Sequence, residues 1–396
     1  MKYLQSTLIL MLIFYTGCGQ VQEDNGHDFY FPLPDEPGEL ITSELQDFYV
    51  QTVVEDVSVP WGMVFLPDGR MLITEREGNV RMVRDGELLD EPLEGAPDVF
   101  IGGSCGLLDI ALHPDYEENG WIYMTYSHKN PDNEEEANTA LMRARLSDHS
   151  LVDQEVLLIA QPYVESRQHS GSRIAFKDGY VIFSIGDRGF DFMDTPQDLG
   201  TQMGKIIRLN YDGSIPSDNP FVDEEGALPE LYTVGHRNTQ GLAVNPETGD
   251  LWSNSHGPIG GDELNHIEKG ENYGWPEISF GEPDPGTTLT GDTAKVGMRS
   301  PIHHWTPAIA PSGMDFVSSD FYPNWNGNLL IGALRGTMIN RVELDGTQEV
   351  VHEEPLLEGI GRMRNVRQAP DGFIYASNES TSEIYRLIPA DMIRTE

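Results

Sequence analysis

Positive charge is scarce in this chain of 396 residues, which carries 25 lysines and arginines against 65 aspartates and glutamates. The formal net charge of −40 excludes nucleic acids and anionic membrane surfaces as partners, because phosphate groups would be repelled. Cysteine is scarcer still, with only Cys18 and Cys105 present, and Cys18 lies in a separable leader. The remaining body therefore cannot form an internal disulfide or a cysteine-based metal site, and Cys105 is predicted to be a small buried apolar residue.

Long apolar runs are also lacking, apart from Leu8–Tyr15 near the N-terminus. This run follows a single lysine and precedes small residues, which is typical of a secretory signal and too short for a membrane span. Because YTGC is similar to a lipobox, residues 1–18 are predicted to be a lipoprotein-type signal peptide; an ordinary signal is the alternative. A lipidated Cys18 would tether the protein without spanning the bilayer, leaving an exported, periplasmic or outer-membrane-anchored protein. Residues 19–45 are predicted to be a flexible polar tether.

The 3.6-residue apolar periodicity of long helices is absent as well. Instead, a unit made of an apolar strand, a tight turn and a second apolar strand recurs along the chain. Asp-Gly and Asn-Gly pairs supply the positive φ angles that tight hairpins need. The copies read GMVFLPDGRMLITER, DIALHPDYEENGWIYMTYS, RIAFKDGYVIFSIGD, GLAVNPETGDLWSNS, VRQAPDGFIYASNE and a degenerate MDFVSSDFYPNWNGNLLIGAL.

Six copies with spacings of roughly 45 to 80 residues have the period of propeller blades. Residues 46–396 are therefore predicted to form an all-β domain, a six-bladed β-propeller of four-stranded antiparallel blades, which exposes only short sheet edges. A pair of β-sandwiches is the alternative, and it explains the hairpins but not their similarity. In a propeller, the residues ahead of each first strand gather at one end of the central channel.

Several of the scarce cations and histidines lie ahead of these first strands. In a chain this acidic, their clustering predicts an anion held at the channel mouth. The alternative is that each arginine pairs with a nearby carboxylate and links two blades. His236 is predicted to be a hydrogen-bonded structural residue. For His303 and His304, both a structural and a functional role stay open. The set is His169, Arg173, His236, Arg237, Asn238, His303, His304, Trp305, Arg362 and Arg364.

A series of short strings, in order, covers the chain from about Val57 to about Ile388 and together resembles the soluble PQQ-dependent glucose and aldose sugar dehydrogenases. The resemblance implies a six-bladed propeller that oxidises the anomeric hydroxyl of aldoses to a lactone with pyrroloquinoline quinone (PQQ) and calcium. The strings are GLLDIALHPDY, QHSGSRIAF, IGDRG, GKIIRLNYDGSIPSDNPF, GHRNTQGLA, HGPIGGDELN, NYGWP, W-TPAIAPSG and RMRNV.

The resemblance implies a role for each matching residue. His169 matches the general base, because a neutral imidazole can take a proton near pH 7. Arg237, also assigned to catalysis, and Asn238 match a pair that contacts the quinone oxygens, where an arginine stabilises growing negative charge. Trp305 matches an aromatic residue over the cofactor plane, with a core tryptophan as the alternative. The arginines that match carboxylate-binding positions are Arg335, Arg362 and Arg364, of which Arg335 stands where many relatives have lysine.

The resemblance also implies a calcium ion bound by the main-chain carbonyls of Gly257 and Pro258, since hard oxygen ligands suit calcium. Asp262 and Glu263 are the alternative direct ligands; the resemblance favours a supporting or structural role for both. A further calcium ion is possible among the residues of ENYGWPEISFG.

Two positions depart from the glucose-oxidising members and are similar to the aldose-oxidising branch. Gln168, assigned here to the cofactor site, replaces an aspartate beside the base, and Ser104 replaces a glutamine. The insertions that shape the sugar pocket in the family are short here, for instance around AQPYVESRQH, and the resemblance therefore implies an open site that discriminates weakly among aldoses.

Two other functions remain open: a calcium-dependent propeller hydrolase such as a lactonase, and a binding module without chemistry. The expected partners are aldose sugars and an external electron acceptor, which could be a quinone, a cytochrome or a dye. The protein is expected to be a monomer or a homodimer, to bind no nucleic acid, and to reach a membrane only through a lipid anchor.

Overall fold

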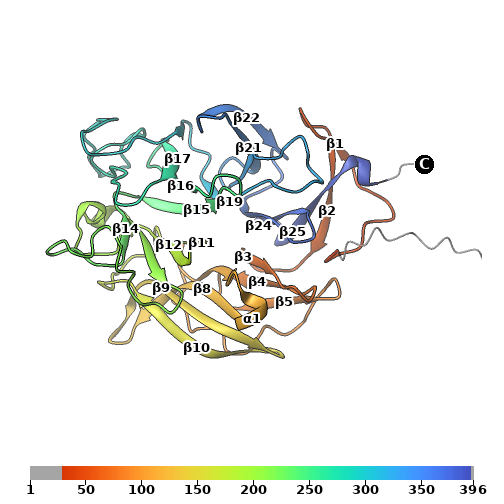
Figure 1. Ribbon diagram of the computed structural model, residues 1–396, viewed down its shortest axis with the longest axis horizontal. Coiled ribbons are helices and arrows are strands. Elements are labelled where there is room, and N and C mark those ends of the chain that lie inside the picture. Colours follow the sequence, from red (N-terminus) through yellow and green to blue (C-terminus); the bar gives the residue numbers. More distant parts are fainter. Residues whose placement is uncertain (1–28, 394–396) are drawn as a thin grey trace, which may run out of the picture.

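The computed structural model describes residues 29–393, so the predicted signal peptide with Cys18 and the first part of the predicted tether lie outside the described residues. Within them, six antiparallel sheets stand around a central axis, as the view down that axis in Figure 1 shows. Five sheets have four strands and one has five. The six-bladed propeller predicted from the repeats is confirmed, and the sandwich alternative is wrong.

The first three blades follow the chain in order, each from an innermost to an outermost strand. Blade one contains β3 (Pro60–Phe65), β4 (Met71–Glu75), β5 (Val80–Arg84) and β6 (Glu87–Leu88). Blade two contains β7 (Leu107–Leu112), β8 (Trp121–Asn130), β9 (Asn133–Ser147) and β10 (Ser150–Ile159). Blade three contains β11 (Gly171–Lys177), β12 (Tyr180–Ile185), β13 (Lys205–Asn210) and β14 (Leu231–Thr233).

Blades four and five repeat this pattern, and blade six combines both ends of the described chain. Blade four contains β15 (Asn238–Val244), β16 (Leu251–His256), β17 (Asp262–Ile267) and β18 (His303–Trp305). Blade five contains β19 (Pro311–Phe316), β20 (Leu329–Ala333), β21 (Met338–Leu344) and β22 (Val350–Leu356). Blade six contains β23 (Met363–Gln368), β24 (Ile374–Asn378), β25 (Glu383–Pro389), β2 (Phe48–Val54) and β1 (Leu40–Ile41).

Helical structure in the described part is confined to short segments. These are α1 (Tyr116–Asn119) and the 3-10 turns η1 (Phe190–Phe192), η2 (Thr195–Gln197) and η3 (Ala390–Met392). Over residues 29–393 there is no helix with the length and apolar character that a bilayer crossing requires.

The ring closes through blade six, where β2 from the N-terminal end pairs antiparallel with β25 and places Phe48 opposite Pro389. The innermost strands contact one another around the ring, and β23 completes it by packing against β3. The closing strand β2 is absent from the repeat pattern, so the repeats alone did not predict it.

The described part of the predicted tether, residues 29–45, is packed on the propeller. Phe31 is buried, and the Tyr30 hydroxyl donates to the carbonyl oxygen of Leu66 at 2.9 Å. The short strand β1 pairs with β2. The prediction of a flexible tether is therefore wrong for this part, because its aromatic side chains bury apolar area that the polar composition around them concealed.

The predicted Asp-Gly hairpins are present. Asp178 and Gly179 connect β11 and β12 with φ angles of 52° and 86°, and Lys177 pairs with Tyr180 across the turn. Positive φ at both turn residues is the geometry that matches the twist of paired strands.

The apolar core of the described chain is divided into six main clusters, each lying between two adjacent blades. Between blades one and two, for example, Leu72 and Met82 pack with Ile122 and Met124. Cys105 is fully buried, as predicted. The core therefore consists of wedges around the axis, each shared by two blades, and is not one cluster on the axis.

Each innermost strand carries a register irregularity near its start. Because a bulge bends a strand and redirects its side chains, these six shifts aim residues into the channel. They begin at Pro60, Leu107, Gly171, Thr239, Pro311 and Met363.

Candidate active site

The six innermost strands all begin at one end of the channel, here called the proximal mouth, and finish at the other, the distal mouth. Hydrogen bonds between different blades show that their starts meet. Asn238 Oδ1 of β15 accepts from the Gly171 N–H of β11 at 3.2 Å, and Arg364 Nη1 of β23 donates to Gln240 Oε1 of β15 at 2.7 Å. The predicted gathering of residues from distant repeats is therefore present in the structure.

His169 lies at this mouth directly ahead of β11, with φ of 47° and its side chain 15% exposed. Its Nδ1 is 2.6 Å from Oδ1 of Asp187, which is almost fully buried. The same oxygen accepts from the Gly189 N–H at 2.9 Å, and Oδ2 accepts from Trp275 Nε1 at 2.8 Å. Since the carboxylate fixes the proton on Nδ1, the neutral ring carries its lone pair on Nε2, the atom that a general base would use.

Arg237 lies ahead of β15 and is 8% exposed. Its Nη1 donates to the Gly257 carbonyl at 2.7 Å, its Nη2 pairs with Asp284 at 3.0 Å, and its guanidinium carbon is 5.3 Å from the centre of the Trp275 ring. Among the described residues its buried Nε has no hydrogen-bond partner. The arginine is thus held from several sides and keeps one unused donor.

The Asn238 amide is oriented by its neighbours. Oδ1 also accepts from Gln240 Nε2 at 3.2 Å, and Nδ2 is 3.4 Å from His256 Nδ1. Burial, followed by the charges of Arg364 and Arg237, lowers the pKa of His256 to about 3. The neutral His256 ring donates from Nε2 to the Pro311 carbonyl at 2.8 Å, which leaves Nδ1 to accept from Asn238.

Arg362 and Arg364 flank one carboxylate, that of Glu379 after β24. Their Nε atoms lie 3.1 Å and 2.6 Å from its two oxygens. Burial raises the pKa of Glu379, but the charges of and hydrogen bonds from the two arginines outweigh burial and lower it overall. Arg364 is buried, whereas the Arg362 side chain is 47% exposed, so Arg362 remains open to an anion at the mouth.

The remaining predicted cofactor residues occupy different places. Arg335 is exposed directly after β20, and Gln168 is exposed beside the candidate base. Trp305 lies on the outermost strand of blade four, in the core wedge between blades four and five, and its Nε1 donates to Glu353 at 2.6 Å. Its surroundings are those of the core tryptophan that the sequence left as an alternative.

The histidines left open by the sequence also have structural partners. His303 on β18 lies 2.9 Å from Glu353, and His304 stacks on Phe280. His236 is buried, stacks on Tyr273, and hydrogen-bonds Thr233 Oγ1 at 2.8 Å. Burial lowers the pKa of His236 to about 3, so it is a neutral, hydrogen-bonded residue.

Gly257 and Pro258, the predicted calcium-binding pair, lie in the turn between β16 and β17, where the Gly257 carbonyl accepts from Arg237 Nη1 at 2.7 Å. Both carboxylate oxygens of Asp262 are already hydrogen-bonded and are not free to bind an ion. Oδ1 accepts from the Gly257 N–H at 2.8 Å, and Oδ2 accepts from the Ala310 N–H at 2.7 Å. Residues 29–393 hold no group of three or more His, Cys, Asp or Glu side chains arranged for a metal. A calcium ion here would need main-chain oxygens and would share the Gly257 oxygen with Arg237.

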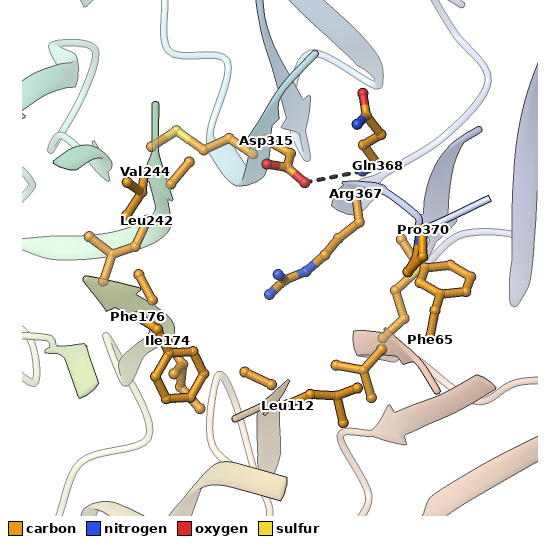
Figure 2. Close-up of a pocket in the computed structure, with 16 residues that line it drawn as sticks. Phe65, Leu112, Ile174, Phe176, Leu242, Val244, Asp315, Arg367, Gln368 and Pro370 are labelled. Atoms are coloured by element: carbon orange, nitrogen blue, oxygen red, sulfur yellow. Dashed lines mark hydrogen bonds between the residues drawn. The ribbon is translucent and has the colours of Figure 1, made fainter. Parts of the chain in front are cut away.

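The distal mouth has a different chemistry, shown in Figure 2. A cavity of about 330 Å³ is lined by the last residues of the six innermost strands, which are mostly apolar, including Phe65, Leu112 and Leu242. Arg367 projects into its middle, and its Nη2 is 3.8 Å from Asp109. Asp109 in turn binds Arg173 at 2.9 Å, so paired charges fill the channel between the two mouths.

Three residues of the proximal mouth were not assigned from the sequence: Asp187, Trp275 and Glu379. Asp187 and Trp275 lie within IGDRG and NYGWP, which the sequence analysis singled out without giving their polar side chains a role. Glu379 follows the last hairpin copy. Acidic residues are too frequent in this chain for such a position to stand out.

The fold and the mouth define the class: a six-bladed propeller with arginines and a carboxylate-bound histidine at one end of its channel. The sequence profile of the Glucose / Sorbosone dehydrogenase family matches residues 57–386. The chain belongs to this family of oxidoreductases.

Two relatives are similar over nearly their whole length. Aldose sugar dehydrogenase YliI of Escherichia coli is 37% identical over 347 residues, covering 86% of this chain and 92% of its own. Quinoprotein glucose dehydrogenase B of Acinetobacter calcoaceticus is 26% identical over 433 residues, covering 89% and 90%.

Solved structures agree with this assignment. The apo form of the soluble aldose sugar dehydrogenase from Escherichia coli superposes with a TM-score of 0.82 at 36% identity, covering 86% of this chain and 99% of its own. The PQQ-bound aldose sugar dehydrogenase from Streptomyces coelicolor superposes with a TM-score of 0.70 at 28% identity, covering 86% and 97%.

Proposed function

We propose that this protein oxidises aldose sugars at the anomeric carbon to lactones, with PQQ and calcium at the proximal mouth. The observation that carries the proposal is the geometry of His169, whose Nδ1 is held by the buried Asp187, so that the lone pair of the neutral ring lies on Nε2, at the same mouth as Arg237. A base oriented in this way, next to a fixed cation, is the pair needed to remove a proton and stabilise the charge that develops.

The donor set of the mouth fits an anionic cofactor. Arg362 is half exposed, Arg335 is exposed, and Arg237 retains an unused buried N–H. Carboxylate groups are bound well by guanidinium groups through paired hydrogen bonds. The PQQ bound by the Streptomyces relative supports the same cofactor here.

In the proposed reaction, His169 Nε2 takes the proton of the anomeric hydroxyl while the hydrogen on the same carbon leaves with its electron pair. The sugar thereby loses two electrons and two hydrogens and becomes a lactone. Arg237 and Asn238 would donate hydrogen bonds to the quinone oxygens of the bound cofactor, on which negative charge grows. Bound PQQ would supply the two-electron acceptor, and calcium on the carbonyls of Gly257 and Pro258 would supply a Lewis acid.

We also propose that Gln168, assigned to the cofactor site from the sequence, makes the discrimination among sugars weak. It is exposed beside His169, and an exposed amide contacts hydroxyl groups without fixing one stereochemistry. We therefore expect several aldoses to serve as substrates.

Reconstitution tests the proposal. The protein loaded with PQQ and calcium should reduce a dye when aldoses are added, and the product should be a lactone. No reduction with any aldose, although PQQ is shown to be bound, would remove the enzyme assignment and leave a binding module. Lactone hydrolysis with calcium alone would instead favour the hydrolase, which the arginine-rich mouth disfavours because, without an anionic cofactor between them, the arginines repel a metal ion.

Cell attachment and electron delivery remain part of the proposal. We propose that the protein is exported and lipidated at Cys18, and that a quinone or cytochrome accepts its electrons. Mass spectrometry of the N-terminal peptide tests lipidation, and acceptor titration of the reduced protein tests electron delivery. Sedimentation separates the monomer from the homodimer.

A further inference from the structure

The connection between β17 and β18, residues 268–302, carries NYGWP and contacts the proximal mouth through Trp275 and Asp284. It is fastened to the segment ahead of β15. The Tyr273 N–H donates to the Val234 carbonyl at 2.8 Å, and the Trp275 N–H donates to the Gly235 carbonyl at 2.9 Å. Trp275 is 7% exposed, so its indole is held within the protein wall of the site.

The indole of Trp275 contacts both halves of the candidate machinery. Its Nε1–H donates to Asp187 Oδ2 at 2.8 Å, while the other oxygen of the same carboxylate holds His169. The guanidinium carbon of Arg237 lies 5.3 Å from the centre of its ring, where a cation is attracted by the aromatic face. One side chain from a distant loop therefore supports the base through its donor and the arginine through its ring.

We propose that Trp275 is a positioning residue for the reaction: its N–H fixes the Asp187 carboxylate against His169, and its ring supports Arg237. This inference rests on the proposed function. Without the indole donor, Asp187 would keep only the donors on Oδ1 and could rotate. Its charge would be less compensated, so it would hold a protonated imidazole more strongly.

Several charged or titratable groups surround His169. Asp187 faces it from the connection between β12 and β13. His256 on β16 is near enough for the charge of His169 to contribute to its lowered pKa, and the carbonyl of Arg237, ahead of β15, accepts from the Asp187 N–H at 2.8 Å. Arg188 donates to the hydroxyl of Ser170, the next residue. Among these groups, only Asp187 is bonded to the imidazole, so a change at Asp187 should dominate its titration.

Trp275→Phe tests the donor, because it removes the N–H and keeps a ring near Arg237. Trp252→Phe is the matched control: Trp252 is buried, and its Nε1 makes no hydrogen bond among the described residues. Titration of the His169 ring protons by NMR in the cofactor-free protein should move to higher pH in Trp275→Phe and stay at the wild-type value in Trp252→Phe. In the reconstituted enzyme, the acidic limb of the rate profile should move the same way, with kcat at pH 6 about tenfold lower.

A second measurement uses only the wild-type protein and does not depend on whether a variant folds. In the wild-type protein, the indole N–H resonance of Trp275 should shift with pH at the same midpoint as the His169 ring, because both bond Asp187, whereas the Trp252 resonance should not. Absence of a common midpoint, or equal His169 titration in both Phe variants, overturns the inference. Both NMR results are independent of sugar oxidation, so failure of the proposed function would be seen separately as a loaded wild-type protein without dye reduction.

Discussion

The two mouths of the channel are built by the same six strands and differ in chemistry. At the proximal mouth every innermost strand is bulged, and arginines, amides and His169 face inward. At the distal mouth the same strands are regular, mostly apolar, and followed by tight connections such as Asp178–Gly179, with Arg367 at the centre. The bulges at the strand starts therefore distinguish the candidate site at the proximal mouth from the regular, apolar strand ends at the distal mouth. The repeated hairpin is common to both.

The strongest test of this contrast is His169→Asn. Loss of the imidazole removes the proposed proton acceptor and should lower kcat by about 10²–10⁴-fold, the usual contribution of a general base. Fluorescence titration should show PQQ affinity within a few-fold of wild type, because an asparagine keeps a polar contact to Asp187. Wild-type turnover in this variant would exclude His169 as the base.

The next largest effect is expected from Glu379→Gln, which leaves the buried Arg364 without its counter-charge. We expect a loss of about 3 kcal/mol in the free energy of unfolding at pH 7. Since the folded-state pKa of Glu379 is lowered, its contribution is present above the ordinary glutamate pKa and is lost as pH falls through the lowered value. Urea denaturation should therefore show the two proteins converging in acid; a gap that stays constant with pH would contradict the ion-pair explanation.

A smaller effect is expected at the Arg237–Asp284 pair, in which a carboxylate of the β17–β18 connection already neutralises a cation assigned to the quinone. Asp284→Asn should tighten PQQ binding by about threefold, because Arg237 would no longer have to give up its ion pair with Asp284 to bind the anionic cofactor. Glu282→Gln removes an exposed negative charge from the same loop and should leave the affinity unchanged. Equal changes in both variants would indicate a general charge effect.

The smallest effect on activity should come from the distal mouth. Arg367→Met should leave kcat within about twofold of wild type, since the side chain lies at the opposite end of the channel, while removing a counter-charge from Asp109 at a cost of about 1 kcal/mol. Steady-state kinetics and thermal unfolding check both parts. A large loss of activity with unchanged stability would show that the two ends are coupled.

Much of the fold could be predicted from the sequence because each hairpin is local: turn residues and apolar strands lie within one short segment. The closing strand β2 could not, since its partner β25 lies at the other end of the described chain and no repeat marks it. His169, Arg237 and Arg364 could be assigned to one mouth because each precedes or begins an innermost strand.

The partners of these residues could not be assigned in the same way. Asp187 and Trp275 come from connections without periodicity, and only the closed ring brings them within 2.8 Å. Trp305 is placed differently from these residues. Its place ahead of an innermost strand suggested the channel, but the residue belongs to the outermost strand of the preceding blade and packs between blades.

Pairing of β2 with β25 has a consequence for how the molecule can be assembled. The β2–β25 pair joins the two ends of the described chain. A polypeptide synthesised from its N-terminus can therefore form five sheets before the sixth has all its strands, and the ring closes only when the last segment is available. In a circular permutant, with the two ends linked and the chain opened at the Asp178–Gly179 turn, blade three would be the last sheet to be completed. Such a rearranged chain should fold to the same ring by a different order of events.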